Sequence, residues 1–323
     1  MASVARAHPN IALVKYWGKA DDELIIPVAG SMSMTLDQFA TTTSVELTTG
    51  HDTFELNGTI ADAKATRRTT TFLDLVRSLA AEAGLDTAGA RAKVVSTNEG
   101  PTAAGMASSA SGFAALATAA AHAYGLDLST KELSRLARRG SGSASRSVID
   151  RFAVWHAGTS DGTSFAEAIT APDMAMVAVT VNAQAKKVSS RQGMVATRET
   201  SPFYQAWIDT TVATLDEMVA ACAAEDFTRI GEITETHAHR MHAVINATHP
   251  PIRYLAPISW QVFEEVTAMR NDGIEAYATA DAGPNVVIIC RPAQAEAVAQ
   301  RVAAFGQVNT FRPGPGAHLV DVA

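Results

Sequence analysis

A stretch of small side chains, PTAAGMASSASG at residues 101–112, is the first candidate for chemistry in this sequence. It follows a strand-like run at 92–97 and enters an alanine-rich helical pattern at 105–124. A helix start offers unpaired N–H groups and the positive end of a dipole, and small side chains let a phosphate approach them. The stretch therefore favours phosphate binding, although a plain strand–loop–helix connection has the same composition.

The common phosphate-binding motifs do not fit this stretch. Gly100 and Gly105 have the spacing of a Walker A loop, but Met106 and Ala107 stand where that loop needs Lys and Ser or Thr. A dinucleotide-binding Gly-x-Gly-x-x-Gly run is also missing from the sequence. The hydroxyls that follow, on residues 108 and 109, could cap the helix or serve a phosphate and its cation.

Charged residues elsewhere stand in contexts that suit catalysis. Asp281 follows the strand-like IEAYATA and precedes AGPN, where a carboxylate could project into a cleft or merely initiate a turn. Lys15 lies inside the apolar run at 11–17, an unusual place for a solvated lysine. Arg146 lies in the small-residue segment GSGSASRS, where it could grip a carboxylate with two parallel hydrogen bonds or face water. By contrast, His237, His239 and His242 lack the i, i+4 spacing with Glu of a helical zinc site, so we expect no metal there.

Composition limits the class of protein. The 323 residues are 47% hydrophobic and 18% charged, which suits one large or two medium globular domains. The net charge of -7 does not suggest a nucleic-acid partner, and the two cysteines provide no disulfide framework. No run of 18 apolar residues and no signal-peptide pattern occurs, so we expect a cytoplasmic protein without a membrane partner.

The elements that must position these residues alternate between strand and helix, which predicts an α/β or α+β fold. A polar stretch at 182–202 separates a strong strand from a long helix, and we place a domain boundary there, giving domains at 1–182 and 183–323. The predicted strands are 43–48, 92–97, 174–181, 274–279 and 286–291. The predicted helices are 68–82, 105–124, 130–139, 203–222, 227–246, 258–271 and 293–304.

Taken together, five stretches resemble the diphosphomevalonate decarboxylases of the GHMP kinase superfamily, in the family's order. They are HPNIALVKYWGK (8–19), PTAAGMASSASG (101–112), GSGSASRS (140–147), KVSSRQGM (187–194) and DAGPN (281–285). The resemblance implies a two-domain GHMP kinase-like fold, with an N-terminal half like ribosomal protein S5 and a ferredoxin-like C-terminal half. It also implies a homodimer that uses ATP and Mg²⁺ to phosphorylate the 3-hydroxyl of mevalonate 5-diphosphate. Loss of that phosphate with CO₂ would then yield isopentenyl diphosphate for isoprenoid biosynthesis.

The resemblance also implies residue roles. Asp281 would orient or deprotonate the hydroxyl, Lys15 would keep Asp281 ionised, and Arg146 would hold the substrate carboxylate. Further substrate contacts would come from Tyr16, Lys19, Arg68, Ser141, Ser143, Ser190 and Arg191. The nucleotide and Mg²⁺ would be served by Gly105, Ala107, Ser108 and Ser109, with Ser109 as the metal ligand.

One departure from the family pattern keeps the substrate open. Asp150 and Arg151 replace a Gly-Gly pair common in relatives, which puts the shape of the pocket beyond Arg146 in question. A decarboxylase of mevalonate 5-phosphate and a GHMP small-molecule kinase are therefore the nearest alternatives. A non-catalytic nucleotide sensor would not need Lys15, Asp281 and Arg146.

Overall fold

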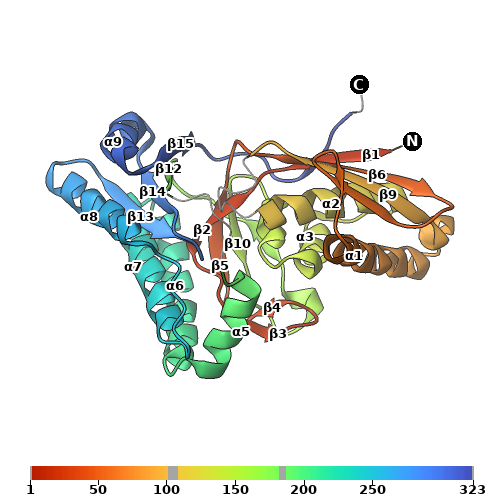
Figure 1. Ribbon diagram of the computed structural model, residues 1–323, viewed down its shortest axis with the longest axis horizontal. Coiled ribbons are helices and arrows are strands. Elements are labelled where there is room, and N and C mark those ends of the chain that lie inside the picture. The colour runs from red at the N-terminus through yellow and green to blue at the C-terminus, as the bar shows by residue number, and fades with distance from the viewer. Residues whose placement is uncertain (1, 101–107, 182–186, 322–323) are drawn as a thin grey trace.

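The computed structural model describes residues 2–100, 108–181 and 187–321, which form a mixed α/β molecule (Figure 1). At one end lies a sheet of strand order β16-β1-β6-β9-β7-β8. The pairings are antiparallel except for β7 with β9. The strands are β1 (Ser3–Ala7), β6 (Thr41–Thr48), β7 (Thr53–Leu56), β8 (Thr59–Ile60), β9 (Arg91–Asn98) and β16 (His318–Leu319).

Helices cover one face of this first sheet. The alanine-rich α2 (Ser108–Tyr124) packs on β1 and β6, because its small side chains let a helix approach the strands closely. Beside it lie α1 (Ala63–Glu82), α3 (Thr130–Gly140) and the short α4 (Ala144–Ser147). Asp62 and Ser129 cap α1 and α3 at their N-termini.

A second sheet carries the segments nearest to the candidate site. Its order is β11-β10-β5-β2, with all pairs antiparallel. Its strands are β2 (Asn10–Val14), β5 (Ser31–Thr35), β10 (Phe152–Trp155) and β11 (Ala166–Ala168). The small hairpin of β3 (Lys19–Asp21) and β4 (Ile26–Pro27) continues from the end of β2. The predictions included none of the four strands of this sheet.

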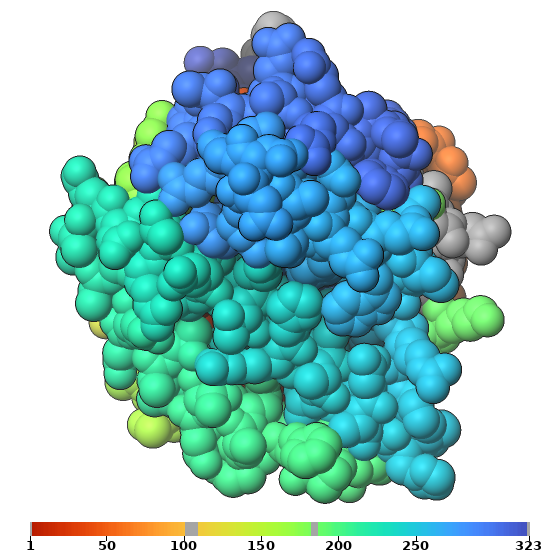
Figure 2. Space-filling model, turned by 90° about the vertical axis from the view of Figure 1, so that its left-hand side faces the viewer, coloured from red at the N-terminus to blue at the C-terminus, as the bar shows by residue number. Residues whose placement is uncertain are grey.

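The C-terminal half is built on the sheet β13-β14-β12-β15. Its strands are β12 (Ala175–Thr180), β13 (Ala276–Ala280), β14 (Val286–Cys290) and β15 (Gln307–Phe311). Alternate residues of β12 pack on opposite sides, so this sheet is buried on both faces. One face packs against α8 (Pro257–Asn271) and α9 (Ala295–Val302), and the other faces α6 (Tyr204–Ala223) and α7 (Phe227–Asn246). Helices of this half form the surface seen in Figure 2.

The segment between the two halves and the two ends of the chain have defined places in the fold. The polar stretch expected to separate two domains contains a helix, α5 (Ser190–Thr200), which starts with a capping box of Ser189 and Gln192. The C-terminal strand β16 pairs with β1, so both ends of the chain return to the first sheet (Figure 1).

Among the described residues, no helix has the length and apolar character needed to cross a bilayer. The domain boundary near residue 182 stays a prediction.

Candidate functional site

An ion pair between the two halves of the molecule lies at the centre of the site. Lys15 Nζ lies 2.8 Å from Asp281 Oδ1, although the two residues are 266 positions apart in the chain. Lys15 follows the last residue of β2, and Asp281 follows the last residue of β13. The structure therefore brings these two predicted residues together, with Lys15 almost fully buried and Asp281 partly exposed.

The electrostatics of Lys15 follow from its position. Burial lowers the pKa of Lys15 below its usual value, and the charge of the adjacent Asp281 raises it again in part. The positive charge of Arg146 lowers it further. A buried ammonium group beside a carboxylate, like that of Lys15, can stabilise negative charge that develops on a bound oxygen.

The guanidinium of Arg146 is held in a buried polar cage. Its Nε donates to Ser33 Oγ at 3.0 Å and to Asn10 Oδ1 at 3.3 Å, and a terminal nitrogen donates to Asn10 Oδ1 at 3.2 Å. The other terminal nitrogen donates to Ser31 Oγ. Burial lowers the pKa of Arg146 to about 10, so the group stays charged near neutral pH.

This cage leaves a defined pair of donors. A guanidinium carries five N–H groups, and the cage engages the Nε–H and one N–H on each terminal nitrogen. Within the described residues, the second N–H on each terminal nitrogen of Arg146 makes no further hydrogen bond. A guanidinium that offers two parallel N–H groups matches the geometry of a carboxylate.

Sequence reasoning did not identify Asn10, Ser31 or Ser33. Residues 31 and 33 of a strand face the same side, and the structure buries both hydroxyls, but the sequence alone does not show that burial. A buried hydroxyl must find a polar partner, and here that partner is Arg146. Asn10 also donates to the backbone oxygen of Ser143 at 3.0 Å, which ties the start of β2 to the GSGSASRS segment.

The beginning of α2 lies beside the same segment. Ser109 Oγ lies 3.3 Å from Ser141 Oγ, and Arg68 donates to the backbone oxygen of Gly140 at 2.7 Å. Burial lowers the pKa of Arg68 to about 10, and the nearby charge of Arg191 lowers it as well. The predicted Ser109, Ser141 and Arg68 are thus neighbours, and α5 brings Arg191 toward them.

Tyr16 packs closely over the GSGSASRS segment. Its ring centroid lies 4.8 Å from that of Trp155. A Cβ atom at Gly142 would lie 2.9 Å from both the Cε1 atom and the phenol oxygen of Tyr16, so only glycine fits there. Charges of Arg146 and Arg191 act on the Tyr16 phenol, whose pKa burial raises well above its usual value.

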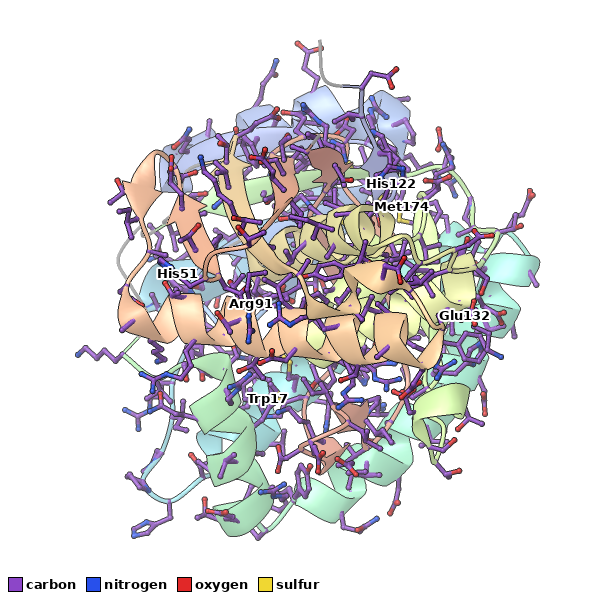
Figure 3. All side chains as sticks on the ribbon, turned by 90° about the vertical axis from the view of Figure 1, so that its right-hand side faces the viewer. Trp17, His51, Arg91, His122, Glu132 and Met174 are labelled. Carbon is purple, nitrogen blue, oxygen red and sulfur yellow. The ribbon has the colours of Figure 1, made fainter. Side chains whose placement is uncertain are left out.

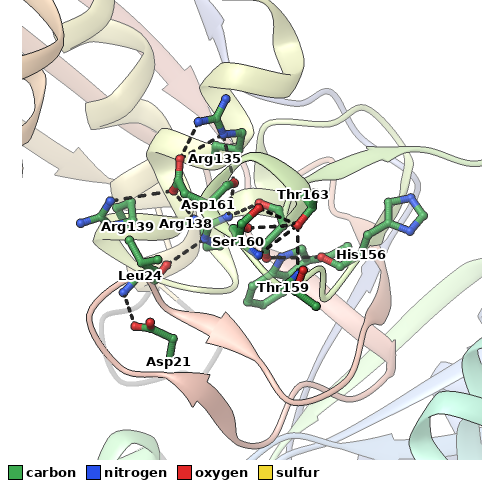
Figure 4. Close-up of polar contacts among 12 residues, drawn as sticks. Asp21, Leu24, Arg135, Arg138, Arg139, His156, Thr159, Ser160, Asp161 and Thr163 are labelled. Atoms are coloured by element: carbon green, nitrogen blue, oxygen red, sulfur yellow. Dashed lines mark hydrogen bonds and ion pairs between the residues drawn. The ribbon is translucent and has the colours of Figure 1, made fainter.

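Lys19 lies on the β3–β4 hairpin, which is anchored from two sides. Arg138 is fully buried and donates through Nε to the backbone oxygen of Leu24 at 3.0 Å, while its terminal nitrogens contact Asp161 and the backbone oxygen of Ser164 (Figure 4). On the other side, Asp22 pairs with Lys19 at 3.2 Å and with Arg198 of α5 at 2.9 Å.

Helix α5 carries Ser190 and Arg191 at its first two positions. The helix packs beside Trp17, whose Nε1 donates to Thr197 Oγ1 at 3.0 Å (Figure 3). The capping box at Ser189 is a sign of this helix in the sequence, and the prediction of a polar connection at 182–202 did not include the helix.

Some of the predicted nucleotide residues lie outside the described part. Gly105 and Ala107 fall between residues 100 and 108, and of Ser108 only its place as the first residue of α2 is described. Over residues 2–100, 108–181 and 187–321, no group of three or more His, Cys, Asp and Glu side chains could hold a metal. A hydroxyl such as that of Ser109 fits Mg²⁺, which keeps several waters and shares phosphate oxygens.

The histidines of α7 have separate surroundings. His237 is buried and its Nδ1 accepts a hydrogen bond from the backbone N–H of Lys15 at 3.0 Å. His242 is also buried, whereas His239 is exposed and stacks on Trp260. The contact of His237 with the backbone of Lys15 was not anticipated, because it joins positions 222 apart.

The structure shows how Asp150 and Arg151 are accommodated in place of the Gly-Gly pair. Arg151 takes the left-handed conformation with φ of 54°, and its side chain pairs with Asp173 at 2.8 Å on the surface. Asp150 accepts a hydrogen bond from Gly316 N at 2.7 Å. A positive-φ residue is thus present at this turn without glycine, at a cost of about 1–2 kcal/mol in backbone strain.

Known proteins match this chain over almost its whole length. Residues 7–166 match the diphosphomevalonate decarboxylase-like N-terminal domain, and residues 175–313 match the mevalonate 5-diphosphate decarboxylase C-terminal domain. Diphosphomevalonate decarboxylase of Homo sapiens is 37% identical over 337 residues, covering 97% of this chain and 82% of the relative.

Solved structures agree with these sequence matches. Mevalonate diphosphate decarboxylase from Staphylococcus aureus has a TM-score of 0.93 and 42% identity, covering 99% of this chain and 98% of that one. MDDEF in complex with MVAPP, AMPPCP and magnesium has a TM-score of 0.92 and 45% identity, covering 100% of this chain and 99% of that one. These matches confirm the predicted α/β fold of the GHMP kinase type. The chain belongs to the diphosphomevalonate decarboxylase family.

Proposed function

We propose that this enzyme catalyses the ATP-dependent decarboxylation of mevalonate 5-diphosphate to isopentenyl diphosphate, releasing ADP, phosphate and CO₂. The observation that carries the proposal is the meeting of Lys15, Asp281 and Arg146, which come from distant segments and act on one another electrostatically. Phosphorylation of a tertiary alcohol followed by decarboxylation needs a carboxylate that orients or deprotonates the hydroxyl, and a cation at the substrate carboxylate. The chain's three charged groups can meet these needs within one site.

Asp281 acts on the 3-hydroxyl in this proposal. Its partly exposed carboxylate can accept the hydroxyl proton as a hydrogen bond or remove it. Lys15, 2.8 Å away, favours the ionised form of Asp281 and stabilises the negative charge that develops on the oxygen.

Arg146 holds the substrate carboxylate with terminal N–H groups that the cage of Asn10, Ser31 and Ser33 does not use. Because these hydrogen bonds hold the guanidinium in place, it is already oriented before substrate arrives. The carboxylate must stay in a fixed position while the 3-phosphate departs and the carbon–carbon bond that releases CO₂ breaks.

The remaining polar groups suit the diphosphate and the nucleotide. Around the 5-diphosphate we place Tyr16, Lys19, Arg68, Ser141, Ser143, Ser190 and Arg191. For the ATP phosphates we place Gly105, Ala107, Ser108 and Ser109, with Ser109 as the protein ligand of Mg²⁺. When bound, Mg²⁺ would neutralise phosphate charge during transfer. A related structure described in complex with MVAPP, AMPPCP and magnesium supports these ligands.

We also infer the metabolic pathway, the cellular compartment and the oligomeric state of the enzyme. It belongs to the mevalonate pathway of isoprenoid biosynthesis, in the cytoplasm, as a homodimer whose subunits divide near residue 182 into a nucleotide-binding domain and a ferredoxin-like domain. Family membership supports the pathway. Sedimentation of the purified protein tests the homodimer.

One assay separates the proposed function from its alternatives. Protein, MgATP and either mevalonate 5-diphosphate or 5-phosphate are incubated, and CO₂ and ADP are followed. Both products from the 5-diphosphate support the proposal. Faster CO₂ release from the 5-phosphate would reassign the substrate. ADP without CO₂ would identify a kinase, and binding of ATP without either product would identify a sensor.

A further inference from the structure

The backbone N–H of Lys15 needs an acceptor that the sheet does not supply. Strand β2 ends at Val14 and is the last strand in the sheet order, so the sheet ladder stops one residue before Lys15. This N–H is buried, and burying it without a partner would cost about 1–3 kcal/mol. His237 Nδ1, 3.0 Å away on α7, is the acceptor.

The hydrogen bonds around His237 specify one tautomer. Because Nδ1 accepts from Lys15, the ring proton belongs on Nε2, which lies 3.1 Å from Thr211 Oγ1. The Thr211 hydroxyl in turn donates to the backbone oxygen of Trp207 at 2.7 Å. Burial lowers the pKa of His237 to about 3, with the charges of Lys15 and Arg240 acting in the same direction. The ring therefore stays neutral in this tautomer across the working pH range.

The same pair of helices holds the residues after Lys15. The indole of Trp207 on α6 packs on the His237 ring with centroids 4.7 Å apart. Its Nε1 donates to the backbone oxygen of Trp17 at 2.8 Å. The chain at residues 15–17 is thus bonded to α6 and α7 at two points.

Helix α7 also packs against both strands that lead to the ion pair. It contacts β2, which precedes Lys15, and β13, which precedes Asp281. Gly231 on α7 lets the ring of Tyr277 in β13 approach, since a Cβ there would lie 2.0 Å from that ring. A displacement of the Lys15 backbone relative to α7 would therefore change the distance between Lys15 and Asp281.

We propose that His237 is a positioning residue, whose Nδ1 fixes the backbone of Lys15 and so sets the geometry of the Lys15–Asp281 pair. This inference rests on the proposed function for its kinetic consequences. The ring itself need not touch substrate, because it acts through the backbone N–H of Lys15. A misplacement of about 1 Å at a reacting group can lower turnover on the order of 100-fold.

A matched pair of variants isolates the acceptor. In His237→Asn the amide oxygen occupies nearly the position of Nδ1 and can accept from Lys15, whereas His237→Leu has similar size without an acceptor. Both variants lose the ring that packs on Trp207. We expect kcat of the Leu variant to fall about 10- to 100-fold and that of the Asn variant to stay at least about ten-fold higher. The KM for ATP should stay within about three-fold in both, since no nucleotide contact changes. As a control, His239→Leu on the exposed side of α7 should keep the wild-type kcat.

Nuclear magnetic resonance of the wild-type protein tests the geometry without any variant. With ¹⁵N-labelled histidine and lysine, we expect His237 as the Nε2–H tautomer and a coupling across the hydrogen bond between Lys15 N and His237 Nδ1. An Nδ1–H tautomer would overturn the proposal even if the variants failed to fold. Equal kcat for the Asn and Leu variants would also overturn it. An enzyme without decarboxylase activity would refute the proposed function instead, and would leave the resonance result to decide the hydrogen bond.

Discussion

Replacing Asp281 by Asn tests the ion pair through both activity and stability. At an effective dielectric constant of about 20, unit charges 2.8 Å apart attract by about 6 kcal/mol. Solvent screens part of this attraction, because 36% of the Asp281 side chain is exposed. Since the substitution leaves the buried ammonium of Lys15 without its carboxylate, we expect a loss of about 2–3 kcal/mol in unfolding free energy near neutral pH.

The stability loss should depend on pH in one direction. Without the Asp281 charge, burial and Arg146 are left to lower the pKa of Lys15, which falls further below the unfolded value of about 10.4. Between these two pKa values the unfolded chain binds more protons, so the variant gains stability as pH rises. The difference from wild type should therefore shrink as pH rises from neutral toward the unfolded pKa of lysine.

Urea unfolding at several pH values measures this difference, and turnover is measured in parallel. We expect kcat of Asp281→Asn to fall about 10²- to 10⁴-fold while ATP affinity stays within about three-fold. The control is Asp173→Asn, which breaks an exposed pair with Arg151 and should cost less than about 0.5 kcal/mol. A variant that retains most of its kcat would remove Asp281 from the mechanism. A stability loss that does not change with pH would refute the assignment of that loss to an unpaired Lys15.

Three further substitutions test the rest of the site. Arg146→Lys keeps a charge but cannot present two parallel N–H groups. In single-turnover assays we therefore expect CO₂ release to slow at least about ten-fold relative to ADP formation. Equal slowing of both products would contradict binding of the substrate carboxylate by Arg146. Gly142→Ala places a Cβ 2.9 Å from Tyr16, and we expect the KM for the mevalonate substrate to rise about ten-fold and the unfolding free energy to fall by about 1–3 kcal/mol; an unaltered KM would separate Tyr16 from substrate binding. Arg151→Gly removes left-handed strain and an exposed ion pair, so chemical denaturation should show a gain of up to about 1 kcal/mol, and a clear loss would contradict the strain.

Hydrophobic periodicity predicted several of the regular elements in both halves. The runs at 92–97 and 286–291 became β9 and β14, and the pattern at 227–246 became α7. β9 is readable because its side chains alternate between core and more exposed positions, whereas β14 is a continuous apolar run because its sheet is buried on both faces. The alanine-rich pattern likewise predicted α2, for which the structure describes Ser108–Tyr124.

Other elements were not predicted from the sequence because their residue patterns are not apolar. Strand β5 carries serines at 31 and 33 on a buried face, so its sequence does not resemble a core strand. Those serines are buried because Arg146 lies among them, and that neighbour is more than 100 positions away. Helix α5 is polar on most of its surface and was recognisable only from its capping box.

What the sequence determined by itself is the chemical inventory and the family. Residue types within short motifs sufficed to select Lys15, Asp281 and Arg146, because a motif keeps its order along the chain wherever it lies in space. Which of these groups meet depends on the folded chain. The caged guanidinium, the neutral His237 beneath Lys15 and the ion pair across 266 residues all depend on how sheets and helices pack. Packing is set by contacts between surfaces distant in sequence, and no local pattern records their distances.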